Sequence, residues 1–412
     1  MKPTTKENLQ ELAILGLCFL LPVLVVVKPG IEGMLTFAAI LIGCAAAITQ
    51  HFIPNKPAEK IGEAARLIIL AGLAQLLIPV SPNTPQIPLI LGAGWLAWAA
   101  LTKTPTQKLE HNKGLATACL LVLWMGWCNL PTPNPNNLIF LAVTIALALS
   151  LRQPKDTKIL GWIITLNCLF VLLLLEPGNR AQNAPLVFTH KNHIAVAGII
   201  ALGIMMTNTG TINTILQITC SGILLVGHSA TGQIGCAILW SWKIAGYWLQ
   251  TKNPKTQMIT WGAIAAATAG AALFAEPILS LLGKKTSLTG RVPLWTTALD
   301  WVPLHPILGA GGTFWEFPGK VFGQNHIQFQ AGNAHNGFLQ MLTNYGAIGL
   351  GLFLLTLTLS ACQTNLKTHQ KALILAACIT PLLTEAFSFP TQESGIIGIW
   401  LAACLIWISP SS

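Results

Sequence analysis

The sequence predicts an all-α polytopic membrane protein with about 12–14 transmembrane helices and one long loop that contains short helices. Hydrophobic residues make up 53% of its 412 residues, charged residues make up only 9%, and the mean hydropathy is +0.63. Soluble domains carry about 25% charged residues, so lipid must surround most of this chain. Apolar runs long enough for helical spans recur from one end of the sequence to the other.

About fourteen apolar segments are candidates for these spans, and several are short enough to be re-entrant pieces instead. The first, Leu12 to Val27, is too long for the apolar core of a signal peptide and has no small-x-small site after it, so we interpret it as a span. The candidates lie at 11–28, 34–49, 66–80, 88–102, 114–129, 137–151, 158–175, 194–206, 213–227, 232–250, 258–275, 337–360, 372–387 and 395–408.

Lysine and arginine gather in alternate loops, which sets the orientation of the spans. With the N-terminus in the cytoplasm, the short outer loops at 79–88 and 129–137 contain no basic residue. The net charge of +10 therefore reflects membrane topology, and the chain has no basic, aromatic-interleaved face for a nucleic acid. The basic residues on the inner side are Lys2, Lys6, Lys56, Lys60, Arg66, Lys103, Lys108, Lys113, Arg152, Lys155, Lys158, Lys252, Lys255, Lys367 and Lys371.

These features divide the chain into four parts: N-terminal helices at 1–180, central helices at 181–275, a long loop at 276–334 and C-terminal helices at 335–412. Long loops in compact proteins are usually functional or disordered. The tryptophans and phenylalanines of this loop favour order. Segment 293–302 predicts a short amphipathic helix on the membrane surface.

The sequence predicts no cofactor and no metal site. The ten cysteines lie almost entirely in apolar runs and lack metal-ligand spacing, so we expect core residues rather than a disulfide framework. The chain contains no P-loop, no GxGxxG and no DxD-type motif. Segment 227–235, GHSATGQIG, lacks the acid and the nucleophile elbow of a serine hydrolase.

Arg291 is the first candidate site residue, because it stands in a Thr-Gly-Arg turn just before the helix predicted at 293–302. A guanidinium group matches the oxygens of a phosphate, and a helix N-terminus adds amide donors. An arginine that pairs with lipid headgroups is an equally good interpretation of the spacing. Downstream, Gly309, Gly311 and Gly312 permit a tight backbone path.

His335 and Asn336 form a second candidate at the mouth of the span 337–360. A histidine at the membrane boundary can accept a proton near neutral pH. Gly346 and Gly349 follow at a spacing that suits close helix packing. The alternative is a histidine that only caps the helix or lies at the interface.

Lys191 and His193 form a third candidate, in FTHKNHIAVAG at the start of another span, with Arg180 in the same outer loop. Such donors suit an anionic headgroup, although an interfacial cluster that snorkels toward water has the same pattern. Glu316 is a candidate carboxylate of the long loop. We expect Lys243, inside a span, to be a snorkelling lysine.

Three elements in this order resemble the O-antigen ligase and polymerase superfamily of bacterial membrane proteins. His335-Asn336, nine residues, Gly346, two residues and Gly349 resemble its signature. LTGRVPLWTTALDWVPLHPILGAGGTFW looks like its long periplasmic loop, in the version of the exopolysaccharide polymerases. THKNHIA looks like its HKN element. The resemblance covers residues 185–360.

Two positions depart from the superfamily pattern. Many relatives carry a glutamate where this chain has Asn344, two residues before Gly346. Many ligases use an arginine near the HKN element, where this chain offers Lys191 with Arg180 nearby. The second phosphate-binding cation is therefore open between Lys191 and Arg180.

The resemblance implies an enzyme of the bacterial inner membrane that works at the periplasmic face. Its donor would be a glycan on undecaprenyl pyrophosphate, transferred to an acceptor hydroxyl without cofactor or metal. His335 would prepare the hydroxyl, and Arg291 would hold the pyrophosphate. The substrate-binding residues would be Lys191, Arg180, Asn336, His193 and Glu316.

Three acceptors remain open: lipid A–core for a ligase, another lipid-linked chain for a polymerase, and a protein for an O-oligosaccharyltransferase. The protein acceptor ranks third, because protein-glycosylating relatives usually carry a large extra C-terminal portion. A transporter or flippase of lipid-linked sugars would instead place charges near the midplane and repeat broken helices in two halves. A purely structural membrane subunit would leave the loop motifs unexplained.

Overall fold

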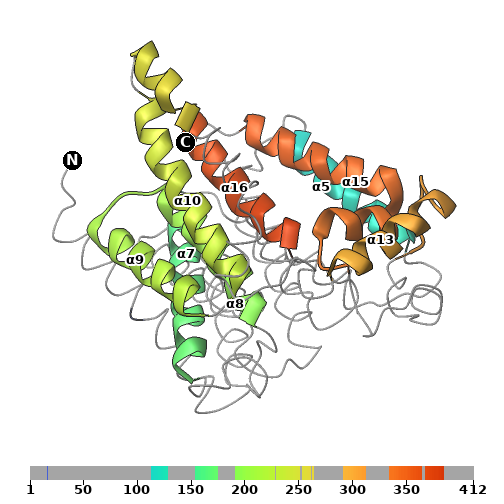
Figure 1. Ribbon diagram of the computed structural model, residues 1–412, viewed down its shortest axis with the longest axis horizontal. Coiled ribbons are helices and arrows are strands. Elements are labelled where there is room, and N and C mark those ends of the chain that lie inside the picture. Colours follow the sequence, from blue (N-terminus) through green and yellow to red (C-terminus); the bar gives the residue numbers. More distant parts are fainter. Residues whose placement is uncertain are drawn as a thin grey trace, which may run out of the picture.

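The computed structural model describes residues 16, 113–128, 154–174, 191–227, 229–250, 253–260, 262–263, 291–311, 334–363 and 367–384 (Figure 1). Every regular element in these ranges is a helix, which confirms the all-α prediction for this part of the chain. The helices are α5 (Lys113–Cys128), α7 (Pro154–Leu174), α8 (Lys191–Met206), α9 (Thr211–Val226), α10 (Ala230–Leu249), α13 (Arg291–Trp301), the 3-10 helix η2 (Val302–Leu304), α15 (Gly337–Gln363) and α16 (Thr368–Thr384).

The apolar runs of the sequence become helices where the structure describes them. The predicted spans 114–129, 158–175, 194–206, 213–227, 232–250, 337–360 and 372–387 correspond to α5, α7, α8, α9, α10, α15 and α16. The short helix predicted at 293–302 is α13, which begins earlier, at Arg291. The candidates at 11–28, 34–49, 66–80, 88–102, 137–151 and 395–408, and most of 258–275, lie outside the described residues.

One described helix is long and apolar enough to cross a bilayer by itself. It covers Gly337–Cys362, with 26 residues and a mean hydropathy of 1.8. Shorter apolar helices cover Lys158–Leu169, Ile194–Met206, Thr211–Val226 and His369–Leu383. The full count of 12–14 spans therefore stays a prediction.

Two groups of helices flank α16 (Figure 1). On one side α8 packs against α7, α9 and α10, and on the other side α15 packs along α5. Small residues bring these helices close: a Cβ at Gly203 of α8 would collide with Ala377 of α16, and one at Gly114 of α5 would lie 2.7 Å from Ser360 Oγ of α15. Helix α16 thus joins the two groups.

Three lysine-bearing helix starts, those of α5, α7 and α16, lie at one end of this arrangement. Gln370, in the first turn of α16, donates to the carbonyl of Thr207 between α8 and α9 at 3.0 Å. The α7 lysine Lys158 lies near Gly210 in the same turn. Lys113 begins α5 beside Ser360, near the last turn of α15. The alternation of basic and neutral loops along the whole chain stays a prediction.

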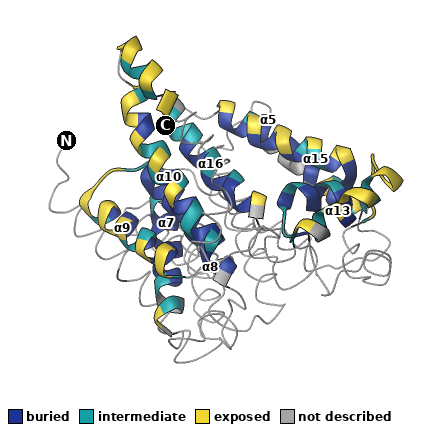
Figure 2. Cartoon of the chain, viewed as in Figure 1, coloured by how far each residue is buried: buried dark blue, intermediate teal, exposed yellow. Residues whose placement is uncertain are grey.

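Helix α9, which has both buried and exposed sides in Figure 2, buries two amide side chains and leaves large apolar side chains exposed. Asn213 and Gln217 are buried, whereas Ile215 is 56% exposed and Ile218 is 62% exposed. Asn213 accepts from Trp162 Nε1 of α7 at 3.2 Å, so the inward polar group is paired. Such a pattern indicates a surface that faces lipid.

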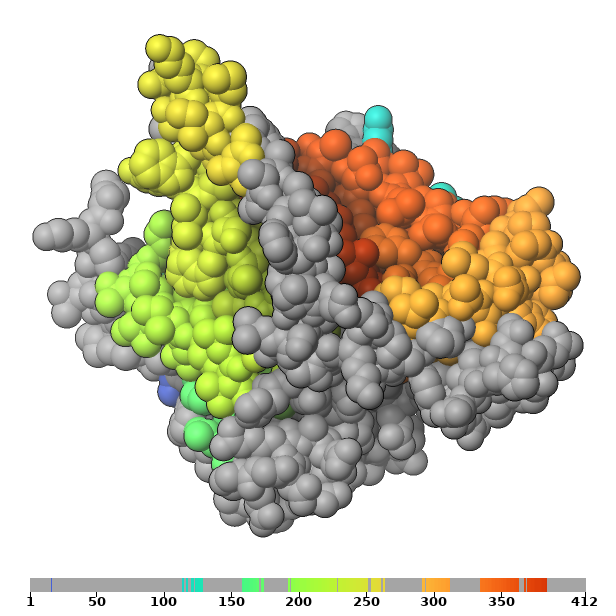
Figure 3. All heavy atoms as spheres, viewed as in Figure 1, coloured from blue at the N-terminus to red at the C-terminus, as the bar shows by residue number. Residues whose placement is uncertain are grey.

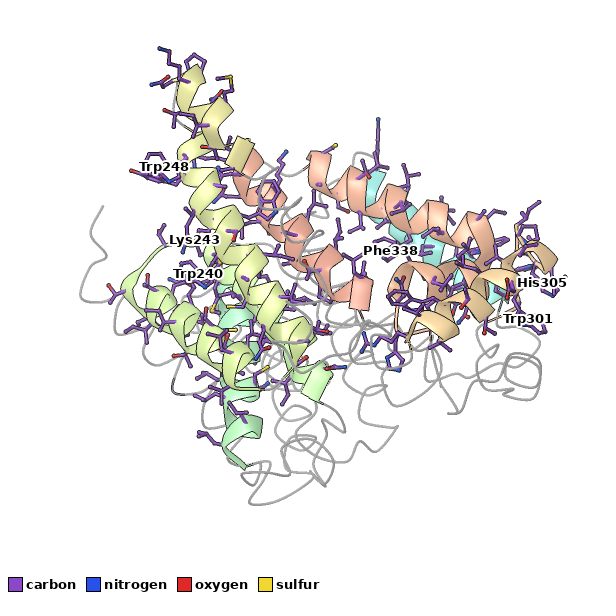
Figure 4. All side chains as sticks on the ribbon, in the orientation of Figure 1. Trp240, Lys243, Trp248, Trp301, His305 and Phe338 are labelled. Carbon is purple, nitrogen blue, oxygen red and sulfur yellow. The ribbon has the colours of Figure 1, made fainter. Side chains whose placement is uncertain are left out.

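The sequence predicts that Lys243 of α10 is a snorkelling lysine that extends toward water. In the structure its side chain also contacts two other side chains. Its ammonium donates to Gln217 Oε1 at 2.6 Å and lies 4.8 Å from the ring centre of Trp240 (Figure 4). The lysine therefore ties α10 to α9 through a buried amide. The six described cysteines are free thiols, and Cys168, Cys220, Cys236 and Cys378 are buried, as expected for core residues.

Candidate functional site

Helix α13 packs across the N-terminal end of α15. Leu294 and Ala298 of α13 are fully buried against Ala334 and Leu339, and the rings of Trp295 and Trp301 cover this cluster. Apolar residues four apart on one helix share a face, which explains why α13 lies flat on its neighbour. Figure 3 shows residues 291–311, in light orange, at the surface beside α15.

Arg291 is the first residue of α13 and is partly exposed. The sequence predicted that Arg291 stands in a turn just before a helix at 293–302, whereas the helix begins at Arg291 itself. At the N-terminus of a helix the backbone amides point outward without partners in the helix, and the dipole favours an anion. Arg291 therefore adds a permanent positive charge to an end that already attracts negative groups.

Ala334, the residue before His335, is held at both of its backbone groups. Trp295 Nε1 of α13 donates to the carbonyl of Ala334 at 2.8 Å. The amide of Ala334 donates to Gln340 Oε1 of α15 at 2.7 Å. Since Ala334 is fully buried, each bond satisfies a group that water cannot reach. The path of the chain into His335 is thereby fixed from two helices.

His335 adopts a left-handed backbone conformation, with φ of 46°, and is partly exposed. Only a few per cent of non-glycine residues adopt this conformation, with Asn, Asp and His enriched among them, and strained residues cluster at functional sites. The next residue, Asn336, caps α15: its Oδ1 accepts from the amide of Leu339 at 3.0 Å. Its Nδ2 also approaches the carbonyl of Leu383, in the last turn of α16, at 3.5 Å. Capping thus falls to Asn336 rather than to the histidine.

Helix α15 is broken at Gly346, where φ is 65° and ψ is −169°. The span predicted at 337–360 is present, and it is kinked at this residue. Segment 302–311, which follows α13, enters the break and exchanges hydrogen bonds with both sides of it. The bonds run from Ala310 N to Thr343 O (2.8 Å), Gly311 N to Asn344 O (3.0 Å), Ala347 N to Pro306 O (2.9 Å) and Ile348 N to Ile307 O (3.3 Å).

The exchange restores partners to the groups that the break separates. In a regular helix the amides of Ala347 and Ile348 would bond the carbonyls of Thr343 and Asn344. The carbonyl of Tyr345, next along the chain, accepts from Trp124 Nε1 of α5 at 3.0 Å. At the break, α5, α15 and segment 302–311 are therefore hydrogen-bonded to one another, and we call this region the joint.

Two glycines make this joint possible. A Cβ on Gly346 would collide with the carbonyl of Ile307, and one on Gly309 (φ 75°) would collide with the backbone of Asn344. Gly349 lies against α5, where a Cβ would come within 3.4 Å of Trp124 Nε1, as expected for a close helix contact. Gly346 serves the joint rather than helix packing, which corrects the interpretation of its spacing.

Residues 215–354 match the model of a protein family described as O-antigen ligase. This segment belongs to the O-antigen ligase family. A search of curated proteins finds no match to the chain. The family match supports a membrane-embedded protein with O-antigen-ligase-type activity in general, a transfer of glycan from lipid-linked substrates with lipid A–core as acceptor.

The O-antigen ligase domain contains four of the predicted site residues: Arg291, Glu316, His335 and Asn336. It also contains the whole joint around Gly346. The structure brings the elements of Arg291, His335 and Asn336 together, because α13 packs on the start of α15. Glu316 lies outside the described residues.

The HKN element precedes the O-antigen ligase domain and forms the first turn of α8. Asn192 is buried there and accepts from Ser229 Oγ at 2.9 Å, which fixes the start of α8 to the start of α10. Lys191 and His193 flank it in the same turn, and their side chains lie outside the described part, as does all of Arg180. The start of α8 and His335 lie at the same end of the helices, opposite Lys113, Lys158 and Lys371.

Sequence reasoning missed Trp295, Gln340 and Trp124, which hold the site without carrying its chemistry. Gln340 lies four residues after the cap Asn336, a spacing at which a side chain reaches back over the first turn, so this residue had a local signal. The bonds of Trp295 and Trp124 join residues far apart in the sequence and had none.

Proposed function

We propose that this protein is an integral-membrane glycosyltransferase that moves a glycan from undecaprenyl pyrophosphate to an acceptor hydroxyl at the periplasmic face. The observation that carries the proposal is the bond from Trp295 to Ala334, which fastens the helix of Arg291 to the peptide before His335. A cation and an imidazole at one membrane boundary suit a reaction between a lipid diphosphate and an alcohol. The family match supports the same class of reaction.

Arg291 binds the pyrophosphate in this proposal. Its guanidinium offers two parallel donors, and the positive end of the helix dipole at the start of α13 adds to the attraction for an anion. A second cation is needed for a diphosphate, and Lys191, at the start of α8, or Arg180 provides it. Asn336, His193 and Glu316 complete the proposed substrate-binding set.

His335 prepares the acceptor. The hydroxyl oxygen attacks C1 of the donor sugar, the bond from C1 to the phosphate oxygen breaks, and undecaprenyl pyrophosphate leaves with the bonding electrons. The imidazole takes the hydroxyl proton, a contribution typically worth ~10²–10⁴-fold in rate. Arg291 and the second cation stabilise the charge that develops on the leaving group. A single displacement inverts the anomeric centre.

The acceptor defines the biological role. Lipid A–core makes the protein an O-antigen ligase, another lipid-linked chain makes it a polysaccharide polymerase, and a protein makes it an O-oligosaccharyltransferase. The residues of the site do not distinguish these acceptors, since all three offer a hydroxyl. The proposal includes about 12–14 spans in the inner membrane.

The direct test is glycan transfer by the purified full-length protein in lipid nanodiscs, with undecaprenyl-pyrophosphoryl glycan and each acceptor in turn. Arg291→Ala and His335→Ala should each abolish transfer while the protein remains folded and monodisperse. The matched control is His305→Ala, which removes an exposed imidazole from the same side of the molecule. Full transfer by either site variant removes that residue from the mechanism, and movement of unreacted donor across the bilayer without transfer favours a flippase.

A further inference from the structure

Segment 302–311, with sequence VPLHPILGAG, contains no charged residue and presents large apolar side chains to the surroundings. Leu304 is 63% exposed, Ile307 is 59% exposed and Leu308 is 55% exposed. His305, labelled in Figure 4, is the one titratable group among them and also lies at the surface. Three exposed aliphatic side chains so close together are unusual for a loop in water.

The length of helix α5 indicates how deep segment 302–311 lies in the membrane. Cys128, the last residue of α5, donates through Sγ to the carbonyl of Leu308 at 3.6 Å. The helix has 16 residues, so at 1.5 Å per residue Lys113, at its other end, is about 23 Å away. Lys113 is exposed and must lie at or beyond the inner boundary of the hydrocarbon core. With Lys113 placed at that boundary and a core about 30 Å thick, Leu308 lies about 7 Å below the outer boundary.

The distance along helix α15 from its first residue also places segment 302–311 well inside the membrane. Ile307 and Pro306 bond the amides of Ile348 and Ala347. Ala347 is ten residues beyond Gly337, the first residue of α15, which at 1.5 Å per residue corresponds to about 15 Å. The segment therefore descends beside α15 instead of remaining level with its start.

The backbone of the segment meets the requirement for such a position. Irregular backbone is tolerated at membrane depth only where protein satisfies its polar groups. Here the carbonyls of Pro306 and Ile307 and the amides of Ala310 and Gly311 bond α15, and the amide of Gly309 bonds the carbonyl of His305 at 3.1 Å. The polar side of the segment thus faces α15, and the aliphatic side chains are left outside.

The exposed side chains continue a surface that already suits lipid. Neighbouring α5 exposes Leu120, Leu123 and Trp127, and α15 exposes Ile348 just after its break. We propose that segment 302–311 is a re-entrant loop in the outer leaflet and that Leu304, Ile307 and Leu308 contact the acyl chains of bilayer lipids. Asp300, one turn earlier at the end of α13, lies at headgroup level. This proposal does not depend on the chemistry assigned to Arg291 and His335.

Site-specific photo-crosslinking tests the proposal in the full chain. The probe p-benzoylphenylalanine replaces Leu304, Ile307 or Leu308 in turn, in nanodiscs of phosphatidylcholine and phosphatidylglycerol. Irradiation should give adducts with phospholipid, detected by mass spectrometry, at more than about five times the yield at the control positions Asp300 and Thr296, because benzophenone inserts into nearby acyl C–H bonds. Both control residues are exposed on α13.

Two results would overturn the proposal. The first is lipid adducts at all three positions no more frequent than at Asp300, which would place the segment no deeper than the headgroups. The second is crosslinks to other residues of this chain instead of lipid, which would mean that protein covers the side chains. A fluorescent amino acid at position 307 gives an independent readout: lipids brominated on their acyl chains should quench it strongly, and a water-soluble quencher should not.

Discussion

The indole nitrogen of Trp295 lies 2.8 Å from the carbonyl oxygen of Ala334, the residue that precedes His335. This bond joins α13, which begins at Arg291 one turn earlier, to the start of α15. Residues four apart on a helix lie on the same face, so Arg291 and Trp295 share a side of α13. This bond and the apolar contacts around it are thus the nearest constraints on the position of the cation relative to the imidazole, and the bonds of segment 302–311 to α15 add to them.

Trp295→Phe should lower kcat for glycan transfer by about 10–100-fold with little change in KM, because small displacements of a catalytic group slow the reaction more than they weaken binding. The phenyl ring keeps most of the apolar contact and removes only the donor. Trp240→Phe is the matched control, since Trp240 donates to Ser221 Oγ at 2.9 Å within the other helix group. Equal kcat values for Trp295→Phe and the wild type would show that the bond positions nothing.

Gln340→Met should lower the free energy of unfolding by about 1–3 kcal/mol, because the buried amide of Ala334 loses its acceptor. The methionine has a similar length and fills the same space. Thermal unfolding in detergent measures the loss, with Gln370→Met as the control at the opposite end of the helices, where the lost bond joins Thr207. We also expect transfer to fall more for Gln340→Met than for Gln370→Met. A larger loss of transfer for Gln370→Met than for Gln340→Met would show that Gln340 does not support the site.

Gly346→Ala should destabilise the protein by at least about 2 kcal/mol, because its positive φ is unfavourable for alanine and the new Cβ meets the carbonyl of Ile307. Gly351→Ala in the same helix is the control: nothing lies within 4 Å of its Cβ position, and alanine should stabilise α15 there by up to about 1 kcal/mol. Unfolding temperatures of the two variants should therefore move in opposite directions. Similar stability for both would contradict the joint between α15 and segment 302–311.

Chelation should leave transfer unchanged, because arginine and lysine supply the positive charge for the leaving group in the proposed mechanism. The measurement is the transfer rate of purified protein before and after dialysis against EDTA. A rate that vanishes with EDTA and returns on addition of Mg²⁺ or Mn²⁺ would contradict this assignment of charge.

The sequence predicted the described helices better than the way they meet. Long apolar runs and alternating basic loops indicate spans and sides, because lipid imposes both. The break at Gly346 could not be predicted, since the apolar pattern of 337–360 continues through it and the compensating bonds come from Pro306 to Gly311. Lys243 was interpreted as a snorkelling lysine because its partner Gln217 lies on another helix.

For the candidate site, the sequence motifs identified Arg291 and His335 as candidates. The structure shows which contacts hold the start of α13 and the start of α15 together. Arg291 and His335 were identified from their residue types, next to a helix start and a span start. The left-handed conformation of His335 and the bonds that hold Ala334 arise from tertiary contacts with α13. Sequence periodicity carries no information on such contacts, so the positioning residues were found only in the structure.

The central claim is that Arg291 binds the donor while His335 prepares the acceptor, and donor binding measured beside transfer tests it most directly. The dissociation constant of undecaprenyl-pyrophosphoryl glycan and the single-turnover transfer rate would be measured for Arg291→Ala and His335→Ala in the same nanodiscs. We predict that His335→Ala binds donor within about threefold of the wild type and transfers none, because its imidazole acts on the acceptor. Arg291→Ala should bind donor at least about tenfold more weakly, since it loses a charge-assisted contact. Normal transfer by His335→Ala, or unchanged donor affinity in Arg291→Ala, would contradict the account.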